Sequence, residues 1–77
     1  MSARPVKHSL TLRGHRTSVS LEAEFWKAFQ DIAGARDQSL TALAVEIDDA
    51  RSPTVGLAGA IRVFVLGYYR EQRGDEA

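Results

Sequence analysis

The segment from position 60 to position 69 is apolar apart from one arginine and one glycine. A helix that is apolar nearly all round must be buried on most of its sides. A chain of 77 residues offers little other material to cover such a helix, because a domain of this size buries only about 60% of its unfolded surface when it folds alone. The chain has no cysteine, so neither disulfides nor a thiolate zinc site can supply the missing stability. This segment therefore predicts that the chain forms a homodimer.

We expect the apolar segment to belong to a helix from about Leu57 to Gln72. The residues that fit the 3.6-residue period of a helix are Leu57, Ile61, Phe64, Val65 and Tyr68. A strand is the alternative, because the β-branched residues Ile61, Val63 and Val65 occupy alternate positions. The helical spacing favours the helix.

One N-terminal β-strand is predicted between positions 9 and 21, where apolar and polar residues alternate. The alternation changes parity at Gly14, as a bulge or bend in the strand would require. If Val19 and Leu21 face a core, parity places three polar side chains on the opposite face of the strand. These are Arg16, Ser18 and Ser20.

Two shorter helices are expected between the strand and the apolar segment. The first begins just after Ser20, which can cap it, and its apolar residues between positions 25 and 33 have helical spacing. The second begins at about Leu40 with Ser39 as its N-cap, and it ends before the turn that contains Pro53. The domain is therefore placed at residues 9–72, with a flexible basic arm at residues 1–8 and a disordered tail at residues 73–77.

Charge is segregated along the chain although its net charge is zero. Residues 1–16 contain four basic residues and no acidic residue, whereas residues 22–51 contain seven acidic and three basic residues. The first segment therefore carries +4 and the second 3 − 7 = −4. Because the local field governs docking on phosphate more than the net charge does, the N-terminal part is a candidate for binding nucleic acid.

A single strand followed by helices would leave the backbone groups of its edges unpaired. The same strand from a second copy would pair with it to give a two-stranded antiparallel ribbon about a two-fold axis, with the helices packed behind it. The major groove of B-DNA admits such a ribbon, and arginine and serine side chains can hydrogen-bond to base edges there. The pattern thus predicts a ribbon that reads DNA.

Several segments of the chain resemble a bacterial ribbon-helix-helix domain family. They are the run Leu-Arg-Gly-His-Arg-Thr-Ser-Val-Ser-Leu-Glu at positions 12–22, Phe25-Trp26, Ser39-Leu40-Thr41, Ala-Ile-Arg-Val-Phe-Val-Leu at positions 60–66, and Tyr68-Tyr69-Arg70. The resemblance covers about residues 9–70. The family is similar in plan to the Arc and MetJ repressors. It implies a mainly α fold with one N-terminal β-strand, an intertwined homodimer with a two-stranded antiparallel ribbon, and an additional C-terminal helix.

The ribbon argument and the resemblance together indicate three sets of site residues. The residues expected to contact bases or to lie on the DNA-facing side of the ribbon are Arg13, His15, Arg16, Ser18 and Ser20. The resemblance implies that the start of the second helix clamps a backbone phosphate through Ser39, Leu40 and Thr41. The residues expected in the dimer core are Val19, Leu21, Trp26, Phe29, Phe64 and Tyr68. A turn-stabilising role for His15 and strand or capping roles for Ser18 and Ser20 are the alternatives.

These features favour a cytoplasmic homodimer that binds double-stranded DNA in a sequence-specific manner as a transcriptional regulator or repressor; tetramer formation on DNA stays open. The alternatives are an antitoxin of a toxin-antitoxin pair and a protein-interaction module that does not bind DNA. An enzyme is not expected, because no nucleophile-and-base arrangement is visible. No cofactor and no membrane association are expected either. A metal site is not expected, because the two histidines are seven residues apart with no cysteine nearby.

Overall fold

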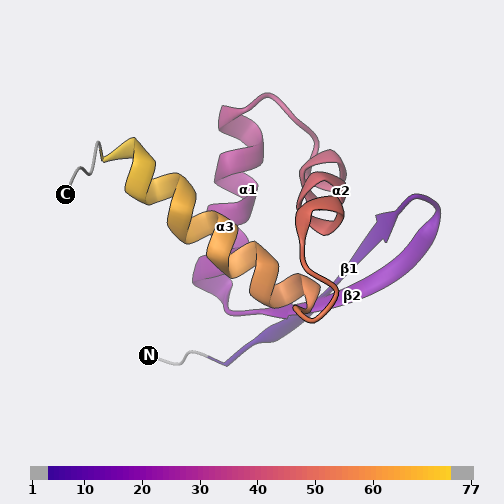
Figure 1. Cartoon of the computed structure of the whole chain (residues 1–77). Coiled ribbons are helices and arrows are strands. Elements are labelled where there is room, and N and C mark those ends of the chain that lie inside the picture. Colours follow the sequence, from indigo (N-terminus) through magenta and orange to yellow (C-terminus); the bar gives the residue numbers. More distant parts are fainter. Residues whose placement is uncertain (1–3, 74–77) are drawn as a thin grey trace.

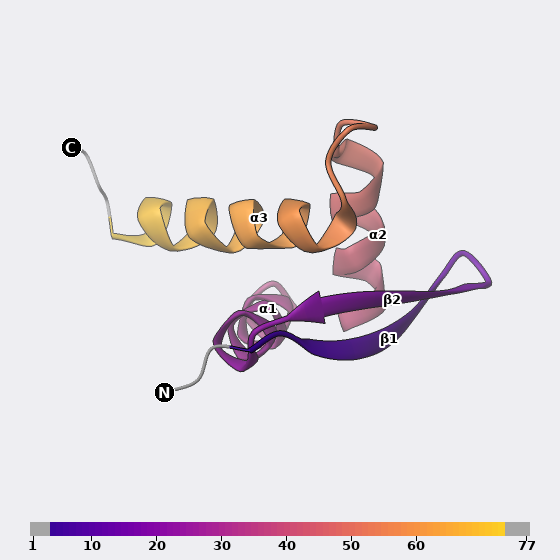
Figure 2. The same cartoon turned by 90° about the horizontal axis from the view of Figure 1, so that it is seen from below.

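The computed structural model of the chain describes residues 4–73. Two strands, β1 (Val6–Leu12) and β2 (His15–Leu21), form an antiparallel hairpin. Three helices follow it in the order α1 (Ala23–Ala35), α2 (Leu40–Ala50) and α3 (Leu57–Gln72) (Figure 1). Figure 2 shows α3 lying across the molecule above α1 and the hairpin. The expected fold class, a ribbon followed by helices, is confirmed.

The ribbon is formed within one chain, which corrects the expectation of a single N-terminal strand that pairs with a second copy. Leu12 pairs with His15, so the chain turns back at the two residues between them. Arg13 and Gly14 both have positive φ angles, of 53° and 82°, as the two central residues of a type I′ hairpin turn require. The change of parity at Gly14 therefore marks a tight turn and not a bulge.

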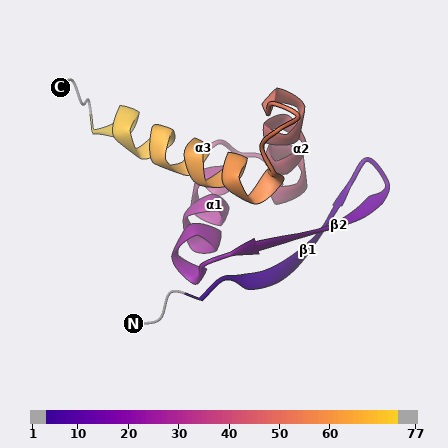
Figure 3. The same ribbon diagram turned by 60° about the horizontal axis from the view of Figure 1, so that its bottom comes forward.

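The hairpin also includes residues that were expected to lie in a flexible arm. Strand β1 begins at Val6, so the last three residues of the 1–8 segment belong to the sheet. Figure 3 shows the two strands twisting about each other, with their turn projecting past α2. Residues 1–3 and 74–77, which hold part of the expected arm and most of the expected tail, lie outside the described residues.

The turn glycine offers a direct test of this hairpin. A Gly14→Ala substitution is expected to lower the unfolding free energy by about 1–2 kcal/mol, because an L-residue is strained at positive φ. Urea denaturation followed by circular dichroism measures the change. Gly34→Ala is the matched control, since the backbone of Gly34 is helical and open space surrounds it; it is expected to stabilise the protein slightly. Equal effects of the two substitutions would contradict the positive-φ turn.

The three helices begin and end close to the expected positions, with one correction. Strand β2 continues to Leu21, so Glu22 and not Ser20 is the N-cap of α1. Ser39 caps α2 as expected, because its hydroxyl accepts a hydrogen bond from the Ala42 amide at 3.0 Å. The apolar segment is a helix, α3, with the expected bounds. None of the helices in residues 4–73 is long and apolar enough to cross a membrane.

The core lies between the inner face of the hairpin and the three helices. Its largest fully buried side chains are Phe29, Leu21, Ile32, Leu43 and Ile61. Helix α3 contributes only Ile61 and Val65 to the buried set, whereas Val63 and Leu66 are 71% and 57% exposed. One chain therefore covers only the inner side of the helix that was expected to need burial on most sides.

Candidate nucleic-acid interface

The hairpin presents a polar face on the side opposite the core. Because side chains alternate along a strand, burial of Leu10, Leu12, Val19 and Leu21 on the inner side directs their neighbours outward. We call the six exposed outward residues the outer hairpin face: Lys7, Ser9, Thr11, Arg16, Ser18 and Ser20. They form three cross-strand pairs, in which Lys7 lies opposite Ser20, Ser9 opposite Ser18 and Thr11 opposite Arg16. This face carries two cations, four hydroxyls and no carboxylate.

The two cations of the outer hairpin face differ in their contacts from the basic side chains that are paired with carboxylates. Within residues 4–73, Lys7 and Arg16 form no ion pair or hydrogen bond. The basic side chains paired with carboxylates are those of Arg13, Lys27, Arg36, Arg51 and Arg62. Lys7 and Arg16 can therefore contact an anionic partner without first breaking an internal ion pair.

The structure divides the five residues that were expected on the DNA-facing side of the ribbon. Arg16, Ser18 and Ser20 lie on the outer hairpin face, as the parity argument predicts. His15 pairs with Leu12 on the inner side of the hairpin, where it lines a hollow with Asp48. It is thus not brought to the outer face.

Arg13 occupies the turn and binds the carboxyl end of α2. Its guanidinium donates a hydrogen bond to Asp49 and lies 3.6 Å from an Asp48 carboxylate oxygen. Asp48 also accepts a hydrogen bond from Arg51 at 2.7 Å. Contact between Arg13 and DNA would therefore have to compete with two carboxylates.

The sequence-based reading missed Lys7, Ser9 and Thr11. It placed the first of these in a flexible arm and did not treat positions 9–13 as a separate strand that pairs with positions 15–21. The alternation itself held the signal, since burial of Leu10 and Leu12 sends Ser9 and Thr11 outward. What the alternation could not show is that β1 lies beside β2, because a hairpin and a bent strand share the same pattern.

The expected phosphate clamp lies at the start of α2. The amides of Leu40 and Thr41 precede the first backbone hydrogen bond of the helix, which Leu43 donates to the Ser39 carbonyl at 3.1 Å. Such amides point toward any acceptor at the helix start. Asp49, which binds the turn, is ten residues further along the chain than Ser39, or about 15 Å along the helix axis. The phosphate role of Ser39, Leu40 and Thr41 stays a prediction.

The residues expected in a dimer core have contacts within one chain. Val19, Leu21 and Phe29 are fully or almost fully buried, at 3%, 0% and 0% exposure. Trp26 is half-buried and stacks on His8, with ring centroids 3.9 Å apart and an angle of 1° between the rings. Phe64 and Tyr68 are also half-buried and lie next to each other on α3, with ring centroids 6.5 Å apart. Their participation in a dimer core stays a prediction.

An ion pair joins α3 to the junction between β2 and α1. Glu22 accepts a hydrogen bond from Arg62 Nε at 3.1 Å, and Arg62 also donates to the Ser20 carbonyl at 3.3 Å. The pKa of the Glu22 carboxyl is held below its usual value mainly by the hydrogen bond that it accepts from its own backbone amide, and also by the hydrogen bond that it accepts from Arg62. This contact fixes the end of the hairpin against two helices.

The lowered pKa of Glu22 predicts that the protein loses stability in acid. A carboxyl whose pKa is depressed by folding contributes stability above its unfolded-state pKa, and this contribution disappears as the pH falls through the folded-state pKa. We expect Glu22→Gln to reduce the difference in unfolding free energy between neutral and acidic pH, as measured by urea denaturation. The matched control is Glu24→Gln, two residues further along in the first turn of α1 and without an ion pair to Arg62. An unchanged pH dependence in Glu22→Gln would contradict the prediction.

Residues 4–73 hold no cluster of three or more side chains that could bind a metal ion. A family model described as a ribbon-helix-helix domain matches residues 5–69. The match includes the whole hairpin, α1, α2 and α3 up to its last turn. No curated protein and no solved structure matches the chain.

Proposed function

Because the chain belongs to the ribbon-helix-helix domain family, we propose that it binds double-stranded DNA through the outer hairpin face and acts as a transcriptional regulator. Ribbon-helix-helix domains commonly occur in DNA-binding regulators. The observation that carries the proposal is the composition of this face. It is exposed, it has no carboxylate, and its two cations form no internal ion pair within residues 4–73.

The dimensions of the hairpin suit the major groove. Two hydrogen-bonded strands lie about 4.8 Å apart, and the major groove is about 12 Å wide, so a two-stranded ribbon enters with its side chains directed at the base edges. An arginine can donate two hydrogen bonds to guanine, and a hydroxyl can bond to any base. In this arrangement Arg16 and Ser18 contact bases, while Lys7, near the open end of the hairpin, contacts a phosphate.

The proposal includes a homodimer that recognises two related half-sites. One hairpin covers only a few base pairs, and two copies about a two-fold axis would read an approximately palindromic operator. Because each ribbon forms within one chain, the two hairpins would occupy separate stretches of the groove. Repression would follow if the bound dimer covers promoter elements.

Binding to the DNA upstream of its own gene tests the proposal. Fluorescence anisotropy would compare this duplex with a scrambled duplex of equal length and composition, for the unmodified protein and for Arg16→Ala. We expect tighter binding to the upstream duplex and loss of that preference in Arg16→Ala. Arg73→Ala, which removes the same charge at the end of α3, is the matched control and should keep the preference.

The same experiment distinguishes DNA binding from a second candidate function, that of a protein-interaction module that does not bind DNA. The engagement of Arg13 by Asp48 and Asp49 favours this candidate, because it reduces the positive charge at the hairpin turn. If neither duplex binds even at low salt, the DNA-binding proposal fails and the interaction module becomes the better account.

A further inference from the structure

The contact between the hairpin turn and the carboxyl end of α2 joins two segments that each depart from a local preference. Arg13 has a φ of 53°, a left-handed conformation that residues other than glycine, asparagine and aspartate rarely adopt. Asparagine or aspartate would make this turn more easily. Because a residue held in an unfavourable backbone conformation is often under a functional constraint, the guanidinium at the tip of the hairpin is a candidate for a specific role.

The acidic partners of Arg13 are also placed against a local preference. Asp48 and Asp49 lie in the last turn of α2, which contains no basic residue. The carboxyl end of a helix carries a partial negative charge, so carboxylates destabilise it and cations stabilise it. Arg13 from the hairpin and Arg51 from the position after α2 compensate this charge. Conflicts between local preference and fold are expected mainly at functional or strained sites, and here two of them meet in one contact.

We propose that Asp49 restrains DNA binding by holding the guanidinium of Arg13, so that the hairpin turn meets DNA without net positive charge until this ion pair opens. The inference rests on the DNA binding proposed above and concerns how strongly the hairpin holds phosphate. While Arg13 is paired, its own charge is offset, and the carboxylates of Asp48 and Asp49 repel a phosphate that approaches the turn. Once released, Arg13 adds one sequence-independent phosphate contact for each chain bound.

The turn lies where a released arginine can reach the DNA backbone. Arg13 follows β1 directly, and its side chain is 50% exposed. It is three residues from Arg16 of the outer hairpin face, or about 10 Å along an extended strand. This distance is comparable to the width of the major groove, which is about 12 Å. With Arg16 at a base edge, a released Arg13 therefore reaches a phosphate that borders the groove.

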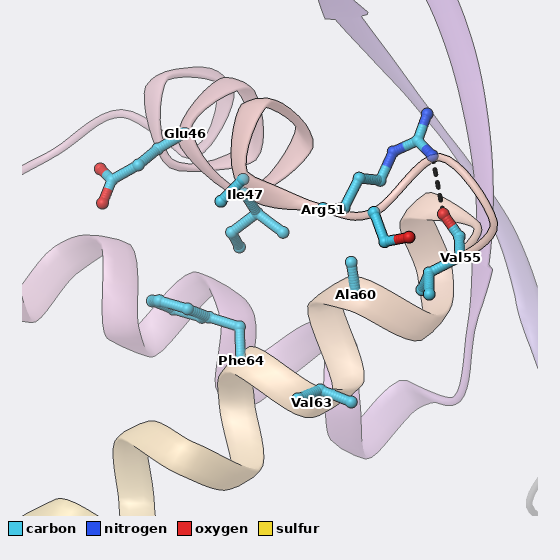
Figure 4. A pocket seen from close by; sticks show the side chains of 9 residues that line it. Glu46, Ile47, Arg51, Val55, Ala60, Val63 and Phe64 are labelled. Atoms are coloured by element: carbon cyan, nitrogen blue, oxygen red, sulfur yellow. Dashed lines mark hydrogen bonds between the residues drawn. The ribbon is translucent and has the colours of Figure 1, made fainter.

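Asp49 and not Asp48 is the carboxylate that can be removed without disturbing the fold. Asp48 also accepts a hydrogen bond from Arg51, which in turn donates to the Val55 carbonyl at 2.7 Å (Figure 4). Asp48 thus anchors the loop between α2 and α3. Asp49 is 58% exposed, and within residues 4–73 its one ion-pair partner is Arg13. Loss of the Asp49 charge leaves Arg13 only its 3.6 Å contact with Asp48.

The ion pair is weak enough for a phosphate to compete with it. The hairpin is held on the helices by Leu10 and Leu12, which are 7% and 6% exposed, so it stays in place when Arg13 is released. An exposed ion pair favours its closed form by a factor of about five at most. The pair can therefore lower the affinity for DNA by a similar factor without preventing binding.

Fluorescence anisotropy with Asp49→Asn tests the inference, on both the upstream and the scrambled duplex and across a salt series. We expect binding to both duplexes to tighten by about two- to fivefold for each chain bound. The slope of log K against log salt should become more negative by about 0.9 for each chain. The matched control is Asp31→Asn, which removes an aspartate of similar exposure from an ion pair with Lys27 on α1. Its affinity should change by less than about twofold.

The same substitution in an Arg13→Gln background shows whether the effect passes through Arg13. Asp49→Asn should then give no gain in affinity, and circular dichroism of each variant verifies the fold. An equal gain in both backgrounds would mean that Asp49 acts only through its own charge, which overturns the inference. If the unmodified protein binds DNA and Asp49→Asn binds no more tightly, the inference fails while DNA binding stands. If neither protein binds any duplex, both proposals fail.

Discussion

Replacement of Lys7 and Arg16 together by alanine is expected to remove most of the affinity for operator DNA. In a dimer the double variant loses four cations that form no internal ion pair within residues 4–73. Each guanidinium bonded to a base edge contributes about 1–3 kcal/mol of discrimination, so the two copies of Arg16 alone account for about 2–6 kcal/mol. The loss of the two phosphate contacts of Lys7, one from each copy, should also reduce the slope of log K against log salt by about 1.8.

Anisotropy titrations across a salt series would measure both quantities for this variant. The matched control is Lys27→Ala/Arg73→Ala, which removes the same types of charge from α1 and from the residue that follows α3. We expect the control to keep nearly the full salt slope. An equal loss in the two double variants would mean that DNA is held by general electrostatic attraction and not by the outer hairpin face.

Replacement of Phe29 by alanine is expected to lower the unfolding free energy by about 3–5 kcal/mol. Phe29 has no exposed surface and lies at the centre of α1, where its ring is 5.9 Å from that of Trp26. A domain of this length has a total stability of about 4–12 kcal/mol, so the substitution removes a large part of it. The cavity cannot close easily, because the hairpin and the other two helices hold the surrounding side chains in place.

Thermal and urea denaturation followed by circular dichroism would measure this loss. Phe29→Leu, which keeps most of the volume, should cost less than half as much. Gln30→Ala, at the next position and exposed to solvent, should change the unfolding free energy by less than about 0.5 kcal/mol. If Phe29→Ala were as stable as Gln30→Ala, the core described for a single chain would be wrong.

The sequence was sufficient for the helices because each carries a local signal. Ser39 marks the start of α2 through its capping hydroxyl, and the apolar spacing from Leu57 onward marks α3. The outward direction of Arg16, Ser18 and Ser20 also follows from local alternation once Val19 and Leu21 are assigned to the core.

The pairing of the strands could not be predicted in the same way. A type I′ turn favours asparagine or aspartate before glycine, and here Arg13 occupies that position with a φ of 53°. The turn therefore lacks its usual sequence signal. Asp48 and Asp49, which Arg13 contacts, are 35 and 36 residues further along the chain than Arg13. No local pattern connects residues so far apart in the sequence.

For α3, the sequence could predict only that one chain does not bury the helix on all sides. The apolar composition of positions 60–69 correctly indicated that one chain cannot bury this helix on all sides. It did not show which residues stay exposed, because that depends on how α3 crosses α1 and α2. Packing of Ile61 and Val65 on the core turns Val63 and Leu66 outward.

Chemical-shift mapping on DNA tests the central claim most directly. Uniformly ¹⁵N-labelled protein would be titrated with the duplex upstream of its own gene, and the backbone amide shifts would be followed residue by residue. The largest changes are predicted at the outer hairpin face, around Ser9, Thr11, Arg16 and Ser18, with a smaller set at the start of α2. Changes confined to α3, or none at all on addition of excess duplex at low salt, would contradict the claim that this hairpin binds DNA.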